Sequence, residues 1–235
     1  MNIKNNRLVI SNILCINLPK SVDRRTHMKH QFDKLSMESS HIGWVSAIPR
    51  IKLNLKHVNY DYRSNKRCYC YNTPCVHRPR KLRPVEVAIS MSHLSAYKSV
   101  IEKNREESFT LICEDDIEFH PNFTKIITDI NLEGDIERPI IVFLGGYPDN
   151  PGLSLSGQTV SKSKKGSYSN YCYLINKKAC EVLVNNFYPI SRPDDSYKRW
   201  LINKGLIDCY QIRPSMVSEL SAGVNNEPKF KRLSR

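Results

Sequence analysis

The sequence lacks a long apolar run, and we expect no secretory leader. A membrane helix needs roughly 18 or more consecutive apolar residues, but the best candidate, residues 8–18, is short and contains Ser11, Asn12 and Asn17. A leader would need a small-residue cleavage site after its apolar region, whereas a Pro-Lys pair and an Asp-Arg-Arg run follow here. We therefore expect a cytoplasmic protein in which residues 8–17 form a buried strand.

The glycine-rich motifs of common nucleotide-binding folds are also missing. The chain has 9 glycines and contains neither GxxxxGK nor GxGxxG, which argues against a P-loop and a standard dinucleotide-binding turn. No internal repeat is evident, and 235 residues that are 40% hydrophobic are compatible with one globular domain. We predict a domain over residues 1–225, with a basic insertion over 50–84 and a basic tail over 226–235.

Acidic residues are few relative to basic ones, 23 against 36, so the formal net charge is +13. Such a charge attracts polyanions, anionic membrane surfaces or phosphorylated ligands without choosing between them. Much of the excess lies in two segments, residues 63–83 and 229–235. Simple solvated charge and a peripheral contact with the inner face of an anionic membrane both stay open.

The eight cysteines fall into two groups. Five lie in apolar strand-like or helical runs, where a free cysteine behaves as a small hydrophobic residue, and we expect them to be reduced: Cys15, Cys113, Cys172, Cys180 and Cys209. The others form a C-x-C-x4-C-x-H pattern with a histidine: Cys68, Cys70, Cys75 and His77. Because this spacing departs from the common zinc pattern, we favour an uncoordinated or disulfide-bonded loop over a structural Zn²⁺ site.

Hydrophobic patterns indicate an α/β protein. Apolar runs bounded by turn residues predict strands near 8–17, 42–48, 109–114, 139–144, 168–175 and 207–213. Helical periodicity and capping residues predict helices over 21–35, 86–101, 121–130, 177–186 and 194–204. Strands that alternate with helices favour a layered domain with a mostly parallel central sheet, and such sheets bind ligands at the carboxyl ends of their strands.

The segment FTLICEDDIEFHP is the most informative, because an apolar strand ends in three consecutive carboxylates, Glu114, Asp115 and Asp116. Adjacent carboxylates raise each other's pKa unless a cation lies among them. Oxygen ligands suit Mg²⁺ or Mn²⁺, which could bridge to the phosphates of a nucleotide. On an extended chain Glu114 and Asp116 would share one side and Asp115 the other. A solvated acidic turn is the alternative interpretation.

Two further segments carry polar side chains of catalytic type. Ser92 and His93 are neighbours in a predicted helix, so they cannot both face the core, although His93 alone would be read as a structural histidine. Asp194 and Asp195 open another predicted helix, where the helix dipole favours negative charge. Capping alone would explain these aspartates, but a carboxylate in a cleft can also act as a general base.

Six segments, in this order, resemble glycosyltransferase family 25, the group of lipooligosaccharide and collagen hydroxylysine galactosyltransferases. They are INLPKSVDRR, WVSAI, EVAISMSHLSAYKSVIE, LICEDDIEF, NYCYLINKKACEVL and RPDDSYKRWL. The resemblance spans most of the chain. It implies a single Rossmann-like domain of the GT-A type, inversion at the anomeric carbon and a UDP-hexose donor, for which we favour galactose.

The resemblance also implies roles for individual residues. Near the donor it places Asn17, Arg24, Arg25, Ser92, His93, Glu114 and Asp115. Asp116 and Glu114 would hold Mn²⁺ or Mg²⁺, and Asp195 would take the proton of the acceptor hydroxyl. The acceptor would be a glycan, glycolipid or glycoprotein, such as lipooligosaccharide, and no nucleic acid is expected.

The sequence departs from the family pattern at two points. Val85 stands where the family's helix has the Gly of a Gly-Glu pair, and Ala88-Ile89 replace a Gly-Cys pair. No histidine occurs after His120, so the distant histidine that GT-A enzymes often use as a metal ligand would have to be replaced by a carboxylate or backbone group. Three rival hypotheses stay open: a nucleic-acid-binding protein, a hydrolase that pairs Asp116 with Asp195, and a non-catalytic family member.

Overall fold

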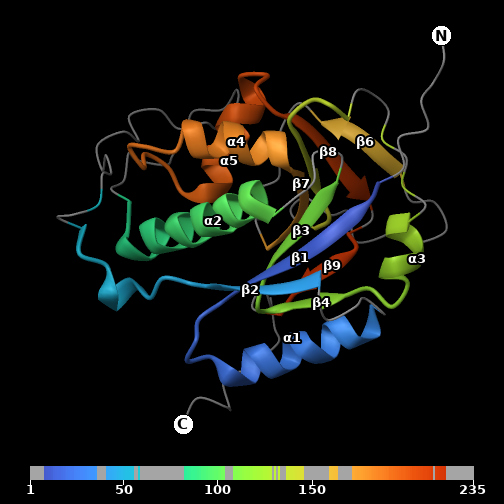
Figure 1. The fold of residues 1–235 in the computed structure, drawn as a ribbon, viewed down its shortest axis with the longest axis horizontal. Helices are drawn as coiled ribbons and strands as arrows, with labels where there is room; N and C mark the ends of the chain where they lie inside the picture. The colour runs from blue at the N-terminus through green and yellow to red at the C-terminus, as the bar shows by residue number, and fades with distance from the viewer. Residues whose placement is uncertain are drawn as a thin grey trace, which may run out of the picture.

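A seven-stranded sheet forms the centre of the protein (Figure 1). The computed structural model describes residues 8–35, 41–55, 58, 82–103, 108–128, 130, 132, 136–145, 159–163, 171–213 and 215–220. The strands are β1 (Ile10–Asn17), β2 (Ile42–Ser46), β3 (Phe109–Glu114), β5 (Ile140–Phe143), β6 (Thr159–Ser163), β7 (Cys172–Asn176) and β8 (Asp208–Arg213). Their order across the sheet is β2-β1-β3-β7-β5-β8-β6.

The sheet is mixed but mostly parallel. Strands β1, β2, β3, β5 and β8 run in one direction, while β7 and β6 run in the other. A second small sheet pairs β4 (Ile117–Phe119) with β9 (Val217–Glu219) in antiparallel fashion. The expected α/β fold with a mostly parallel central sheet is therefore confirmed.

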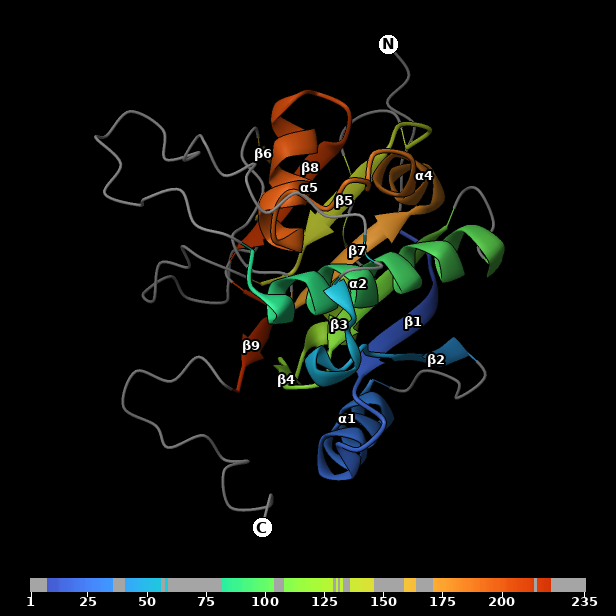
Figure 2. The ribbon, with the colours of Figure 1, turned by 90° about the vertical axis from the view of Figure 1, so that its left-hand side faces the viewer.

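Helices cover both faces of the central sheet. They are α1 (Val22–Lys34), α2 (Pro84–Lys103), α3 (Phe123–Thr128), α4 (Lys177–Asn185) and α5 (Asp194–Asn203), with a 3-10 turn η2 (Arg50–Lys52). Helices α2, α4 and α5 lie on one face, toward the viewer in Figure 2, and α1 and α3 pack on the other. All five predicted helices are present, whereas the short strands β4, β6 and β9 were not predicted.

Strand β3 shows why the sheet strands read as continuous apolar runs. Leu111 and Cys113 pack on the side of α1, while Ile112 packs on the side of α2. Because a strand buried on both faces favours apolar residues on both sides, β3 is apolar up to Cys113 except at Thr110, and it becomes charged only at its last residue, Glu114. The carboxylates therefore stand at the carboxyl edge of the sheet.

The five cysteines that we expected to be reduced are buried and free of disulfides. The pattern of Cys68, Cys70, Cys75 and His77 lies outside the described residues, as do the tail 226–235 and most of the insertion 50–84. Within the described ranges, no helix is both long and apolar enough to cross a bilayer.

An ion pair is buried at the start of α5. The side chains of Lys198 and Asp194 contact each other, and both are 0% exposed. Lys198 Nζ also lies 4.2 Å from the ring centroid of Tyr173, and the Tyr97 hydroxyl donates to both carboxylate oxygens of Asp194 at 3.0 Å. Burial lowers the pKa of Lys198, while Asp194 opposes this effect. Since buried charges are costly unless paired, each partner depends on the other.

Replacing Lys198 with Met should lower the free energy of unfolding by about 3–5 kcal/mol, because Asp194 would stay buried without its lysine. The control Lys178→Met removes an ion pair with Glu137 that is more exposed, and should cost less than about 1 kcal/mol. Urea denaturation measures both losses. Similar losses in the two variants would contradict the role of the buried pair.

Candidate active site

Two carboxylates at the end of β3 share one arginine. The Arg24 Nη1 atom donates to Asp115 Oδ1 at 2.9 Å and to Asp116 Oδ2 at 3.1 Å. Asn17, the last residue of β1, donates from Nδ2 to Asp115 Oδ2 at 2.7 Å. Asp115 and Asp116 are each only 7% exposed. Arg24 thus provides a cation among the adjacent carboxylates and fixes the start of α1 against the sheet.

The expected alternation of the three carboxylates does not continue past Glu114. Strand β3 ends at that residue and the chain then bends, so the side-chain alternation of an extended strand no longer applies. As a result, Asp115 and Asp116 share Arg24, whereas the Glu114 carboxylate contacts His93 instead. Glu114 and Asp115, rather than Glu114 and Asp116, line the same cleft.

The carboxylate of Asp116 is only partly stabilised by its neighbours. Burial, together with the negative charge of Glu114, raises its pKa from 3.8 to about 6, although Arg24 acts in the opposite direction. In the described part of the chain, Asp116 Oδ1 and Asn17 Oδ1 are buried without a hydrogen-bond partner. Both atoms are acceptors, so a cation or a hydrogen-bond donor from a ligand would satisfy them.

The carboxylates fit an open divalent-cation site better than a closed one. The described residues contain no group of three or more His, Cys, Asp or Glu side chains arranged to hold a metal ion. A Mg²⁺ that bridges to substrate phosphates usually needs only one or two protein carboxylates. Glu114 lines the cleft and could contribute one such carboxylate, whereas Asp116, whose Oδ1 is buried without a partner, is not part of the cleft lining.

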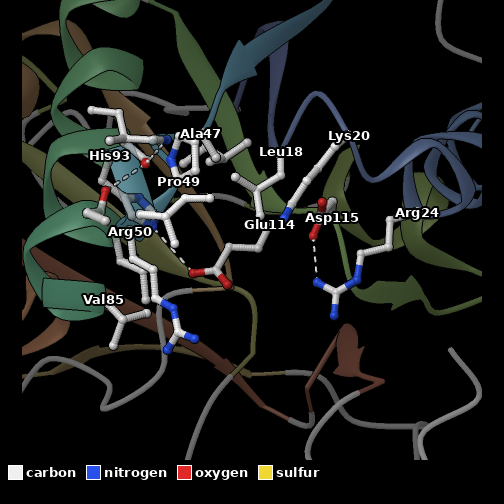
Figure 3. Close-up of a pocket in the computed structure, with 16 residues that line it drawn as sticks. Leu18, Lys20, Arg24, Ala47, Pro49, Arg50, Val85, His93, Glu114 and Asp115 are labelled. Atoms are coloured by element: carbon white, nitrogen blue, oxygen red, sulfur yellow. Dashed lines mark hydrogen bonds and ion pairs between the residues drawn. The ribbon is translucent and has the colours of Figure 1, made fainter. Parts of the chain in front are cut away.

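A cleft of about 430 Å³ opens beside these carboxylates. Its apolar lining comes from Ile16, Leu18, Ala47, Ile48, Pro49, Ile51, Val85, Ala88 and Ile89. Three basic residues also line it, namely Lys20, Arg24 and Arg50. Figure 3 shows Glu114 between His93 on one side and the Asp115–Arg24 pair on the other. The cleft therefore combines negative, positive and apolar surfaces.

Ser92 and His93, which we did not expect to face the interior together, are both buried and both line the cleft, but they make different contacts. Ser92 Oγ donates to the Ala88 carbonyl at 2.7 Å and accepts from the Ile48 backbone N–H at 2.9 Å. Ser92 thereby attaches the segment after β2 to α2 and helps to shape the cleft. His93 is 1% exposed, and its Nε2 atom lies 3.3 Å from Glu114 Oε1.

Four of the predicted site residues are not part of the cleft lining: Asn17, Arg25, Asp116 and Asp195. The Arg25 guanidinium stacks over Trp44, 4.4 Å from the ring centroid. Asp195 lies in the first turn of α5, where its Oδ1 accepts from the Ser196 backbone N–H at 2.6 Å. Burial, which is the largest effect, raises the pKa of Asp195 above its ordinary value. Its neighbour Asp194 forms the buried ion pair with Lys198.

Sequence reasoning missed two basic residues of the cleft, Lys20 and Arg50. Lys20 follows β1, and a search of the loops after parallel strand ends would have found it. Arg50 lies at the edge of the predicted insertion, where no motif distinguishes it from other basic residues. Tyr97 and Tyr173 were also missed, because in sequence they read as ordinary members of apolar segments.

The replacement Asp116→Asn should stabilise the ligand-free protein at neutral pH. A raised pKa means that the folded state favours the protonated carboxyl, so this contribution is complete below about pH 4 and is lost as the pH rises through 6. Asparagine is always neutral, so the variant should gain on the order of 2 kcal/mol at about pH 8 and almost nothing at about pH 4. Thermal melting at the two pH values measures the difference.

Asp115→Asn provides a comparison of opposite sign, because it weakens the acceptor of both Asn17 and Arg24. We expect this variant to melt at a lower temperature than the wild type at about pH 8. If Asp116→Asn instead lowered the melting temperature at about pH 8 as much as Asp115→Asn does, the pKa of Asp116 would not be raised in the folded protein.

Comparison with known proteins identifies a family. The model of Glycosyltransferase family 25 (LPS biosynthesis protein) matches residues 10–145, more than half of the 235-residue chain. The matched range runs from β1 to just beyond β5, and it includes Arg24, His93 and the three carboxylates. Asp195 lies beyond this range.

A curated relative points to the same family. The chain is similar to a "Glycosyltransferase 25 family member" of Anopheles gambiae, with 31% identity over 119 residues. The aligned part is 51% of this chain but 19% of the relative. The chain thus spans about a fifth of the length of the relative that it matches.

Proposed function

The chain belongs to glycosyltransferase family 25, and from this membership we propose that it is an inverting hexosyltransferase that uses a UDP-sugar, with galactose as the favoured hexose. The proposed acceptor is a hydroxyl group of a glycan such as lipooligosaccharide. The observation that carries this proposal is the cleft at the carboxyl ends of β1 and β3, where carboxylates, basic residues and an apolar lining come together.

The cleft has a suitable size and charge for a nucleotide donor. Ligand sites commonly measure about 300–1,000 Å³ and are mostly apolar with a few polar groups, and this cleft measures about 430 Å³. The apolar lining would accommodate the base and ribose. Arg24 is already paired with two carboxylates, so Lys20 and Arg50 are the basic residues that we assign to the diphosphate.

In the proposed reaction the acceptor oxygen attacks the anomeric carbon from the face opposite the nucleotide, and the bond from that carbon to the diphosphate oxygen breaks. Asp116 and Glu114 would hold Mn²⁺ or Mg²⁺, which when bound offsets negative charge on the diphosphate. Asp195, which lies in the first turn of α5 outside the cleft lining, would take the proton of the acceptor hydroxyl, and its raised pKa makes it a stronger base. Asp194 is unsuited to this role because it is buried against Lys198.

The proposed acceptor is chosen from the net charge of the protein. The net charge of +13 favours acceptors that carry phosphate or other anionic groups, and it supports a peripheral contact with the inner face of an anionic membrane. Glycolipid acceptors present both features at one surface. A protein acceptor would use the same cleft, but it would not require a basic surface around it.

Asp116→Asn and Asp195→Asn should each abolish most turnover of the UDP-sugar, by at least about a hundredfold in kcat. The exposed Asp33→Asn change in α1 is the matched control and should retain wild-type activity. Release of UDP in the presence of Mn²⁺ and a glycan acceptor measures turnover. Full metal-independent transfer by Asp116→Asn would contradict the metal assignment, and full transfer by Asp195→Asn would contradict the assigned base.

Lys20→Met and Arg50→Met should each weaken UDP binding by about tenfold, because each change removes a charged contact to phosphate. The affinity for uridine, which has no phosphate, should stay the same. Lys29→Met removes an exposed lysine of α1 away from the cleft lining and serves as the control. Titration calorimetry measures all affinities, and equal losses for uridine and UDP would contradict the assignment.

A further inference from the structure

A series of buried polar side chains leads from the Lys198–Asp194 ion pair to the cleft. Its members come from three elements of the fold, and each is at most 2% exposed: Lys198 and Asp194 of α5, Tyr97 and His93 of α2, and Tyr173 of β7. We call these five residues the buried polar series. At its end it meets Glu114, whose side chain is 31% exposed.

His93 is the member that reaches the cleft carboxylate. Its Nδ1 atom lies 2.9 Å from the Tyr173 hydroxyl and 3.7 Å from Asp194 Oδ2. Its Nε2 atom lies 3.3 Å from Glu114 Oε1. Both ring nitrogens therefore have polar neighbours, one toward the core and one toward the cleft.

The rest of the series fixes the two groups that meet Nδ1. The Tyr173 hydroxyl donates to the Tyr97 hydroxyl at 3.4 Å, and Tyr97 donates to Asp194. The Tyr173 ring also stacks on the His93 ring, with centroids 6.0 Å apart and planes 25° apart. A rotation of the imidazole would break these contacts in a fully buried place, so the ring is held in one orientation.

Glu114 depends on that orientation. Among the described residues, His93 makes the only hydrogen bond to the Glu114 carboxylate. A glutamate side chain that is 31% exposed otherwise has several rotamers to choose from. The position of the carboxylate in the cleft is therefore set by His93.

Stability alone does not account for the series. A buried ion pair with its hydrogen-bonded partners is often no more stable than well-packed apolar residues of the same volume. An apolar core at this place would hold α2, α5 and β7 together as well, but it would leave the His93 ring and the Glu114 carboxylate without their fixed orientation.

We propose that Tyr173 and Asp194 are positioning residues for the transfer reaction: they orient His93, and His93 fixes the carboxylate of Glu114 for its contact with the donor. This inference relies on the proposed function for the identity of the donor. Neither Tyr173 nor Asp194 needs to touch a substrate. Both act through the imidazole.

A double-mutant cycle tests the proposal. Tyr173→Phe keeps the ring and removes the hydroxyl next to Nδ1, and it should lower kcat/KM for the UDP-sugar by about tenfold. In a Glu114→Ala background the same change should have less than about a twofold effect, because the carboxylate through which it acts is absent.

Tyr197→Phe is the matched control, because Tyr197 is also buried and its hydroxyl donates to the Leu183 carbonyl at 2.6 Å, away from His93. This variant should keep kcat/KM within about twofold in both backgrounds. A tenfold loss from Tyr173→Phe in both backgrounds, or an equal loss from Tyr197→Phe, would show a merely structural effect and overturn the proposal.

A second readout needs no donor. The ¹⁵N resonances of the His93 ring, identified by their loss in His93→Gln, should change in Tyr173→Phe but not in Tyr197→Phe. If the wild type turns over no UDP-sugar while these resonances change as expected, the proposed function fails and the orienting contact stands. Unchanged His93 resonances in Tyr173→Phe would overturn the inference whatever the activity.

Discussion

Arg24 lies between two adjacent carboxylates, and the charge balance that it provides governs the carboxyl end of β3. Its Nη1 atom contacts Asp115 and Asp116 at 2.9 and 3.1 Å, and both aspartates are nearly buried. One arginine does not satisfy them fully, because the pKa of Asp116 is still raised to about 6 and its Oδ1 atom is buried without a partner in the described structure. A divalent cation would offset this residual negative charge.

The same arrangement separates the three carboxylates into different roles. Asp115 is held by Asn17 and Arg24 and so joins β1, α1 and β3. Asp116 shares the arginine but retains an unsatisfied oxygen, while Glu114 turns into the cleft toward His93. The buried polar series behind His93 then connects the interior of the helical layer to the cleft. Fold and candidate site are thus linked through hydrogen bonds at one edge of the sheet.

Much of the fold could be predicted from the sequence, because central strands are buried on both faces and carry continuous apolar runs; β3 has the predicted bounds, Phe109–Glu114. Edge strand β6 is polar and the small sheet consists of three-residue strands, so neither has a pattern that stands out. Neighbouring residues of one type were harder to distinguish. Arg24 and Arg25 have the same chemistry in sequence, and only the structure shows that one binds carboxylates and the other stacks on Trp44.

We propose above all that the cleft beside Glu114 binds a nucleoside diphosphate sugar together with a divalent cation. Thermal melting of the wild-type protein with a panel of nucleotide-sugars, with and without Mn²⁺, tests it most directly. UDP-hexoses should raise the melting temperature, more strongly when Mn²⁺ is present, and uridine should have little effect. No shift with any nucleotide-sugar, together with salt-dependent stabilisation by DNA or RNA, would contradict it.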